Sequence, residues 1–178
     1  KINEIKSYIG VERTDIGPYL RNLIEIGLVF RDVPVTLSEN TRLGRYYIKD
    51  NFVKFWFRFI YPSLSAIEGN YFKIQIIKNQ YNDYLGFIFE DICRQYLIEN
   101  YSELFTKIGR WWGKEGEIDI VAINWETNET IFGSCKWKEK VNPKTMAKEL
   151  ISISEKVDWK NQERKPIYFI FAKSFQEK

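Results

Sequence analysis

The sequence predicts an α/β protein of the α+β kind, with helices packed on a mixed β-sheet. Two observations support this prediction. The first sixty residues follow the order helix, turn, helix, hairpin. The second half follows the order helix, two strands, helix and strand, with strand-like alternation and helix-like spacing of apolar residues. We expect a first domain over 1–60, a connecting helix over 61–80 and a second domain over 81–178.

The composition restricts the chemistry that this chain can perform. The 178 residues include two cysteines and no histidine. Histidine-based nucleophile systems and histidine-ligated zinc are therefore excluded. Carboxylates, lysines, tyrosines and a hard metal ion such as Mg²⁺ remain. A net charge of +3 is compatible with nucleic-acid binding without indicating it.

The same composition favours a cytoplasmic protein. Two cysteines in a chain of this size are typical of a reduced compartment. No apolar run approaches the roughly 18 residues of a membrane span, so we expect no membrane contact. The chain opens at Lys1 without a methionine or a secretory signal. We expect a fragment of a longer protein, of unknown oligomeric state.

The first domain resembles a winged helix that lacks its first helix. A helix is expected near Ile2–Ile9, a second over 14–26 with Thr14 or Asp15 as its N-cap, and then a two-stranded hairpin. The resemblance implies a helix in a DNA major groove, with Arg21 and Arg45 as candidate contacts. A packing or protein-contact module remains the alternative.

An aromatic block follows in "NFVKFWFRFIYP". Four of its aromatic residues recur at helical spacing, and we expect them to form a buried helix: Phe52, Phe55, Trp56 and Phe59. A base-stacking surface is the less favoured interpretation.

The second domain is expected to begin with an amphipathic helix, "DYLGFIFEDICRQYLIENY", residues 83–101. Glu90 lies near the border of its apolar stripe. From the helix pattern alone, Glu90 is an exposed carboxylate paired with Arg94.

Two strands follow, in 110–124 and 129–139. In the first, Ile118, Ile120 and Ala122 are expected on one face, with Glu117, Asp119 and Val121 on the other. In the second, Ser134 and Lys136 share a face. If the strands form a hairpin, Asp119 and Lys136 converge. They form either a cross-strand ion pair or part of a ligand site.

This order of elements resembles the restriction-endonuclease-like fold of the PD-(D/E)XK nucleases, with "GEIDIVA" as the closest segment. The resemblance implies a three-layer core and a Mg²⁺ site. It makes Asp119 a metal ligand, Glu90 the helix carboxylate and Lys136 the group beside the attacking water. Ser134 stands where the family has an acid, so Glu117 replaces that ligand or the site is degenerate.

Both halves together resemble the C-terminal region of archaeal P-loop ATPases, most specifically in "YYIKDNFVKFWFRFIYP". The chain has no phosphate-binding loop of its own. The resemblance therefore implies that ATP binds only to a domain upstream of this chain, which would be its partner.

The last segment contains a predicted helix over 142–161 and a predicted central apolar strand over 165–174. In nuclease relatives the helix after the lysine strand faces DNA. Four residues are thus candidate phosphate contacts: Lys138, Lys140, Lys144 and Lys148. An equally favoured interpretation is that these lysines form a solvated surface without a ligand.

The resulting functional hypothesis is a DNA-binding domain that hydrolyses phosphodiesters with Mg²⁺, or that has lost this activity at Ser134. The alternative is a non-catalytic protein-interaction or regulatory module of the ATPase.

Overall fold

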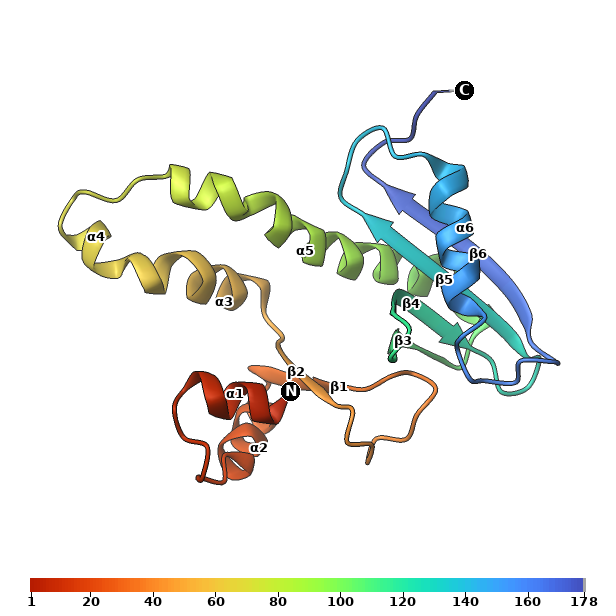
Figure 1. Cartoon of the computed structure of the whole chain (residues 1–178), viewed down its shortest axis with the longest axis horizontal. Coiled ribbons are helices and arrows are strands. Elements are labelled where there is room, and N and C mark those ends of the chain that lie inside the picture. The colour runs from red at the N-terminus through yellow and green to blue at the C-terminus, as the bar shows by residue number, and fades with distance from the viewer. Residues whose placement is uncertain (178) are drawn as a thin grey trace. The chain divides into compact units, whose positions relative to one another are not determined.

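The structure is a computed structural model that describes residues 1–177, and its contacts divide the chain into two units. Unit 1 contains residues 1–32 and 42–84, and unit 2 contains residues 33–41 and 85–178. Figure 1 labels the helices and strands of both. The expected mixture of helices with a mixed β-sheet is confirmed.

Unit 1 begins with two helices and a hairpin, in the predicted order. They are α1 (Ile2–Tyr8), α2 (Gly17–Glu25), β1 (Val29–Asp32) and β2 (Arg45–Ile48). The strands are antiparallel, with Val29 opposite Ile48. The expected start of α2 is wrong, because its N-cap is Ile16 and Pro18 lies in its first turn. Asp15 instead accepts a hydrogen bond from the amide of Gly17 at 2.9 Å.

The aromatic block forms a helix with changing pitch. It comprises α3 (Asn51–Phe55), the π-helical η1 (Trp56–Ile60), the 3₁₀ turn η2 (Tyr61–Ser63) and α4 (Leu64–Glu68). The expected burial holds for Phe59, which is 2% exposed, whereas Phe52 is 70% exposed. The π-helical turn changes the period within the block, so side chains at regular helical spacing do not share one face.

The long helix α5 (Gln75–Tyr101) begins eight residues before the predicted residue 83, and the short turn η3 (Ser102–Leu104) follows it. The boundary between the two units falls within α5, after Tyr84. Residues 61–80 are therefore not one connecting helix, since they contain η2, α4 and the start of α5. In unit 2, Cys93 and Leu97 are the most buried side chains of α5.

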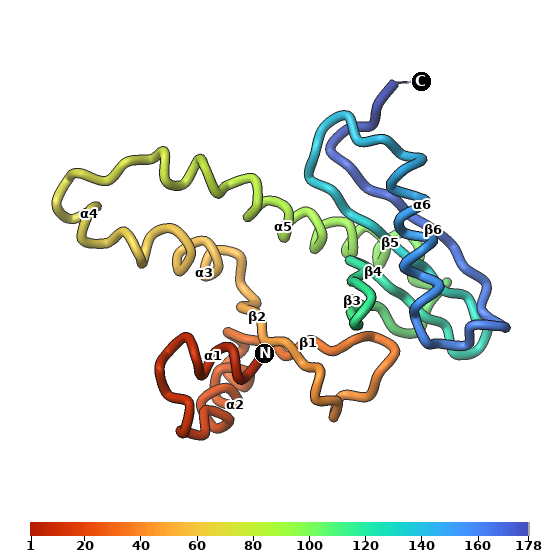
Figure 2. The backbone as a smooth tube through the Cα atoms, viewed as in Figure 1, coloured from red at the N-terminus to blue at the C-terminus, as the bar shows by residue number. Residues whose placement is uncertain are grey.

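Unit 2 is built on a four-stranded sheet in the order β3 (Lys107–Trp112), β4 (Glu117–Ile123), β5 (Glu129–Lys136) and β6 (Lys165–Ala172). The first three strands are antiparallel, and β6 is parallel to β5. After β5 the chain passes through α6 (Pro143–Ser154) and returns as β6, a path visible in Figure 2.

Two strand predictions need correction. The sequence predicts one strand over 110–124, whereas the structure has two, β3 and β4, with Gly113 and Gly116 in the turn between them. Strand β6, expected in the centre, lies at the end of the sheet order. The helix predicted over 142–161 ends at Ser154.

Hydrophobic clusters cover both faces of the sheet. The α5 cluster contains Cys93, Leu97, Ile120, Ala122 and Ile131. The α6 cluster includes Leu150 of α6 with Val121, Ile123 and Phe132 of the sheet. Unit 2 thus has a helix, a sheet and a helix as successive layers.

A β-bulge in β4 sets the position of the polar residues. Gly109 pairs with Val121, but Trp111 pairs with Ile118, so Arg110 lies opposite both Asp119 and Ile120. The extra residue in β4 reverses the alternation of side chains between the two faces of the sheet. Ile118 therefore belongs to the α6 cluster while Ile120 and Ala122 belong to the α5 cluster. The expectation that these three share one face is wrong.

Candidate functional site

An ion pair between α5 and β3 lies at the centre of the polar region of unit 2. Nη2 of Arg110 donates to Oε2 of Glu90 at 2.8 Å, and the two side chains are 12% and 22% exposed. Burial raises the pKa of Glu90 to about 7, although the charge of Arg110 acts in the opposite direction. The predicted pairing of Glu90 with Arg94 is wrong.

Asp91 joins this ion pair to a second arginine. Its Oδ1 lies 3.7 Å from Nη2 of Arg110 and also binds the guanidinium of Arg94, three residues along α5. Two arginines and two adjacent carboxylates thus form one partly buried network. Such a network balances charge within the protein and leaves Glu90 already bound to a cationic group.

Asp119 is held by the backbone of the neighbouring strand. The amide of Cys135 donates to Oδ2 of Asp119 at 2.7 Å. Burial raises the pKa of Asp119, while this hydrogen bond and the charge of Arg110 partly offset that effect. Asp119 also raises the pKa of Glu90, so the two carboxylates interact electrostatically.

Lys136 and Ser134 lie on the face of the sheet that α6 covers. Nζ of Lys136 lies 3.0 Å from Oε2 of Glu149 on α6, and both side chains are exposed. Phe132 belongs to the α6 cluster and Cys135 packs on the α5 cluster. Strand alternation therefore places Ser134 on the α6 side. Lys136 thus forms its ion pair with Glu149, while its charge also acts to lower the pKa of Asp119.

Glu117 lies at the exposed beginning of β4, opposite Trp112. Only Ile118 separates it from Asp119 along β4. It contributes to the raised pKa of Asp119. The structure thus places Glu117 near the acidic pair without joining it to Glu90 and Asp119 in a ligand set.

The arrangement does not fit a Mg²⁺ ion. Within residues 1–177, no three acidic, cysteine or histidine side chains are gathered closely enough to hold a metal ion. Glu90 is bound to a guanidinium, Asp119 accepts from a backbone amide, and Ser134 supplies no carboxylate. Mg²⁺ requires clustered oxygen ligands, which these residues do not form here.

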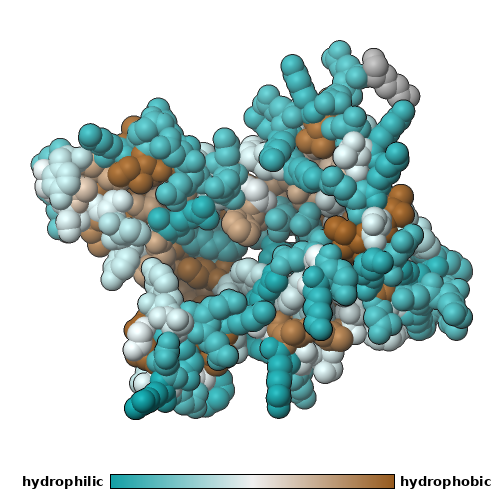
Figure 3. Space-filling model, viewed as in Figure 1, coloured by the Kyte–Doolittle hydropathy of each residue, from teal (hydrophilic) through white to brown (hydrophobic). Residues whose placement is uncertain are grey.

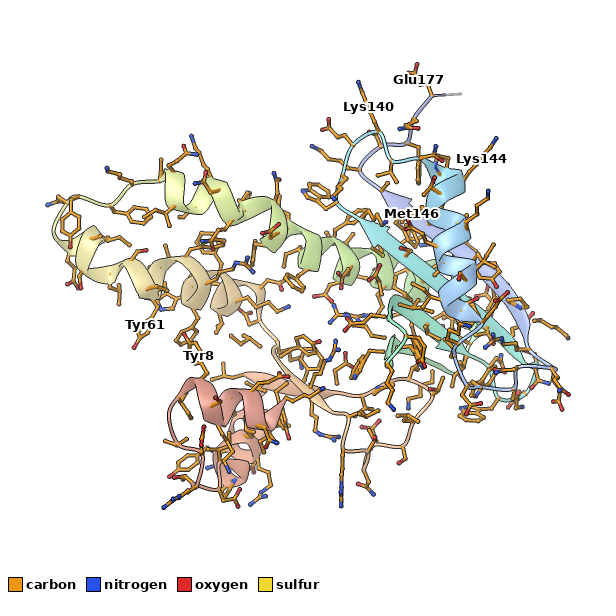
Figure 4. All side chains as sticks on the ribbon, in the orientation of Figure 1. Tyr8, Tyr61, Lys140, Lys144, Met146 and Glu177 are labelled. Carbon is orange, nitrogen blue, oxygen red and sulfur yellow. The ribbon has the colours of Figure 1, made fainter. Side chains whose placement is uncertain are left out.

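The four candidate phosphate contacts all lie on the surface of unit 2. Lys138 and Lys140 follow β5, whereas Lys144 and Lys148 lie one turn apart on α6. Figure 4 shows Lys140 and Lys144 pointing outward, in contrast to Met146, which lies between α6 and the sheet. Hydrophilic residues cover most of this region in Figure 3, with small hydrophobic patches between them.

The candidate contacts in unit 1 lie on different elements. Arg21 is exposed on α2, and Arg45 is partly buried at the start of β2. The charge of Arg45 contributes to the lowered pKa of Glu4 in the first turn of α1. The DNA contacts predicted for Arg21 and Arg45 stay a prediction.

The sequence interpretation missed two residues that define the polar region. Arg110 was not considered because β3 was not recognised, although the alternation in "KIGRWW" is a strand signal. The role of the Cys135 amide depends on the bulge that brings Asp119 to it. No sequence pattern indicates that bulge.

None of the helices within residues 1–177 is long and apolar enough to cross a membrane.

Comparisons with known proteins identify relatives without known activity. An uncharacterized protein of Methanocaldococcus jannaschii is 48% identical over 143 residues, which are 78% of this chain and 33% of that protein. The chain thus spans about a third of the length of this relative. No solved structure matches the chain. Residues 56–151 match the model of a family described as archaeal and bacterial proteins of unknown function. With more than half of its length matched, the chain belongs to this family, DUF234.

Proposed function

We propose that unit 2 is a DNA-binding module of restriction-endonuclease-like architecture that binds without cleaving. The observation that carries the proposal is the 2.8 Å ion pair between Arg110 and Glu90. Glu90 matches the helix carboxylate of the nuclease motif, and its partner is an internal guanidinium. A fixed positive charge at this carboxylate opposes the approach of a divalent cation.

The loss of cleavage follows from three separate departures from the nuclease pattern. The motif acid is Ser134, the helix carboxylate is paired with Arg110, and Lys136 is paired with Glu149. Phosphodiester hydrolysis in this fold requires a metal ion to activate water and stabilise charge on the phosphate. Replacement of one ligand would weaken such a site, and the three departures together favour binding alone.

Binding is supported by the charges near β5 and α6. Lys138, Lys140, Lys144 and Lys148 are exposed, and none of them forms an ion pair within residues 1–177. The acidic residues next to them in sequence are already paired. Glu139 contacts Lys173 at 2.5 Å, and Glu149 contacts Lys136. Four lysines without local counter-charges suit the phosphates of a nucleic-acid backbone.

The test is fluorescence anisotropy with labelled duplex and branched DNA over a range of salt concentrations. Four phosphate contacts predict a slope of log affinity against log salt of about −3.6. The four-lysine variant Lys138→Ala, Lys140→Ala, Lys144→Ala and Lys148→Ala should lose most of this slope. A control with four other exposed lysines changed, Lys73, Lys78, Lys114 and Lys156, has the same net charge.

Equal loss of affinity in both variants would leave only a general charge effect and contradict the proposed site. Plasmid or branched DNA incubated with Mg²⁺ or Mn²⁺ should remain intact. Cleavage that disappears in Asp119→Ala would overturn the non-cleaving assignment. Absence of DNA binding at low salt would overturn the module itself.

That last outcome would favour a second candidate, a protein-contact module. Its specific support is the aromatic surface of unit 1, where Phe52, Phe57 and Tyr61 are 70%, 52% and 58% exposed. Exposed aromatic side chains are enriched at protein interfaces. Replacement of these three residues by serine should then abolish partner capture by the full-length protein without changing DNA affinity.

The roles of unit 1 and of the complete protein are further parts of the proposal. The order helix, helix, hairpin supports a winged helix that contacts DNA through Arg21 and Arg45. The resemblance of residues 46–62 to archaeal P-loop ATPases supports an upstream ATPase domain in the complete protein. We expect DNA to change the rate of ATP hydrolysis by the complete wild-type protein. In the four-lysine variant, DNA should leave this rate unchanged.

A further inference from the structure

The two cysteines of the chain, 42 positions apart in sequence, meet in one cluster of unit 2. Cys93 lies on α5 and is 3% exposed, whereas Cys135 lies on β5 and is partly buried. Both belong to the hydrophobic cluster between α5 and the sheet. Cys93 is a member of this cluster and Cys135 packs against it, and both cysteines are free.

We propose that Cys93 and Cys135 form a reversible disulfide that joins α5 to β5, and that a low-molecular-weight disulfide is the oxidant. Neither nucleic-acid binding nor cleavage is required for this inference. Both side chains pack in one cluster between the same helix and strand, so the two sulfur atoms can meet without unfolding of unit 2.

The reaction is a double thiol–disulfide exchange. Cys135, the more accessible of the two, attacks one sulfur of the small disulfide as its thiolate and releases the first small thiolate. Cys93 then attacks the Sγ atom of Cys135, forms the protein disulfide and releases the second small thiolate. The two protons lost by the cysteines protonate the released thiolates. Two cysteines are oxidised and one small disulfide is reduced.

The surroundings of Cys135 determine how fast this reaction proceeds. The neighbouring Cys93 thiol and burial raise the pKa of Cys135. The thiolate is therefore scarce at neutral pH, and the reaction is slow there and faster as the pH increases. The pair resists mild oxidation and responds to a sustained supply of oxidant.

The disulfide would act on the polar region described above. Cys93 lies one turn after Glu90 on α5, and the amide of Cys135 holds Asp119. A covalent bond between the two cysteines closes the chain from residue 93 to residue 135 into a loop. This constrains the unfolded chain and should raise the melting temperature by about 5–15 °C.

The test treats the full chain with glutathione disulfide at pH 7 and pH 8.5 under native conditions. Mass spectrometry should show the loss of two hydrogen atoms, and a non-reduced digest should contain the peptides of Cys93 and Cys135 linked together. The reaction should be faster at pH 8.5, and a reducing thiol should reverse it. The oxidised protein should melt at a higher temperature than the reduced protein.

Two single variants separate the steps. Cys93→Ala should stop at a stable mixed disulfide on Cys135, whereas Cys135→Ala should remain unmodified because Cys93 is buried. A wild-type product that remains glutathionylated, forms disulfide-linked dimers or keeps both thiols free would overturn the proposal. An internal disulfide that lowers the melting temperature would also overturn it, because the thiols would then be wrongly placed in the fold. Peptide mapping of the wild type gives a result even if a variant fails to fold.

Discussion

Arg110 of β3 donates to Glu90 of α5 across 2.8 Å, from a position opposite the bulge that contains Asp119. The guanidinium thus binds the carboxylate of the helix and also interacts electrostatically with the carboxylate of the strand. It lowers the pKa values of both acids, although burial raises each of them above its ordinary value. The positive charge of Arg110 therefore balances the negative charges of this polar region from within the protein.

Removal of this cation should destabilise the fold. Arg110→Ala leaves Glu90 charged and partly buried without its partner, which we expect to cost about 2–4 kcal/mol of unfolding free energy at pH 8. At pH 5.5 the cost should be smaller, because Glu90 is then mostly protonated. Chemical denaturation at both pH values measures the difference.

Arg94→Ala is the matched control for this experiment, because Arg94 binds Asp91 on the same helix and makes no ion pair with Glu90. Its cost should be smaller than that of Arg110→Ala and should depend less on pH. Equal costs for the two variants at both pH values would contradict a specific role for Arg110.

Glu90 should make stability depend on pH in a defined direction. Its pKa is raised from 4.5 to about 7, so the folded state binds this proton more tightly than the unfolded state does. The resulting stabilisation is complete below pH 4.5 and is lost as the pH rises through 7. Glu90→Gln should remove this dependence, which denaturant unfolding between pH 4.5 and pH 8 measures.

The exposed Glu99 on the same helix provides the comparison. Glu99→Gln should leave the pH dependence between 4.5 and 7 unchanged. Should the stability of Glu90→Gln follow that of the wild type at every pH, the raised pKa of Glu90 would not contribute to folding.

The strand pattern was sufficient to predict the β4–β5 hairpin but not the geometry of its polar residues. Alternating apolar residues in 117–123 and 129–136 predict two paired strands, and Val121 does lie opposite Phe132. The bulge at Asp119 and Ile120 arises from pairing with β3, a long-range contact that local alternation does not encode. One extra residue was enough to move Ile118 to the other face.

The sequence pattern predicted the exposure of the surface lysines better than it predicted the partners of the acidic residues. The four lysines near β5 and α6 are exposed, as polar residues outside the apolar stripes usually are. The position of Glu90 on α5 was also predicted, but its partner was not. That partner comes from another element, and helix spacing reports only neighbours on the same helix.

Restoring the missing motif acid should not restore a metal site. Ser134→Glu places a carboxylate on the α6 side of β5, whereas Glu90 and Asp119 interact with Arg110 on the α5 side. We expect no saturable Mn²⁺ binding by isothermal titration calorimetry and no cleavage of plasmid DNA. Ser134→Gln serves as the uncharged control. Stoichiometric Mn²⁺ binding that requires Asp119 would instead indicate that the acids converge.

Asp119 should contribute to stability through its hydrogen bond with the amide of Cys135. Asp119→Ala leaves that amide without its acceptor, next to the buried α5 cluster, and should cost about 1–3 kcal/mol of unfolding free energy. Asp119→Asn retains an acceptor oxygen and should cost less. Denaturant unfolding measures both.

DNA affinity separates this structural role from a catalytic or binding role. Both variants should bind DNA as the wild type does, since the proposed phosphate contacts are the four lysines near β5 and α6. Loss of DNA binding in Asp119→Asn, with stability retained, would show that the carboxylate itself takes part in recognition. If the two variants are equally unstable, the charge of Asp119 rather than its hydrogen bond maintains the bulge.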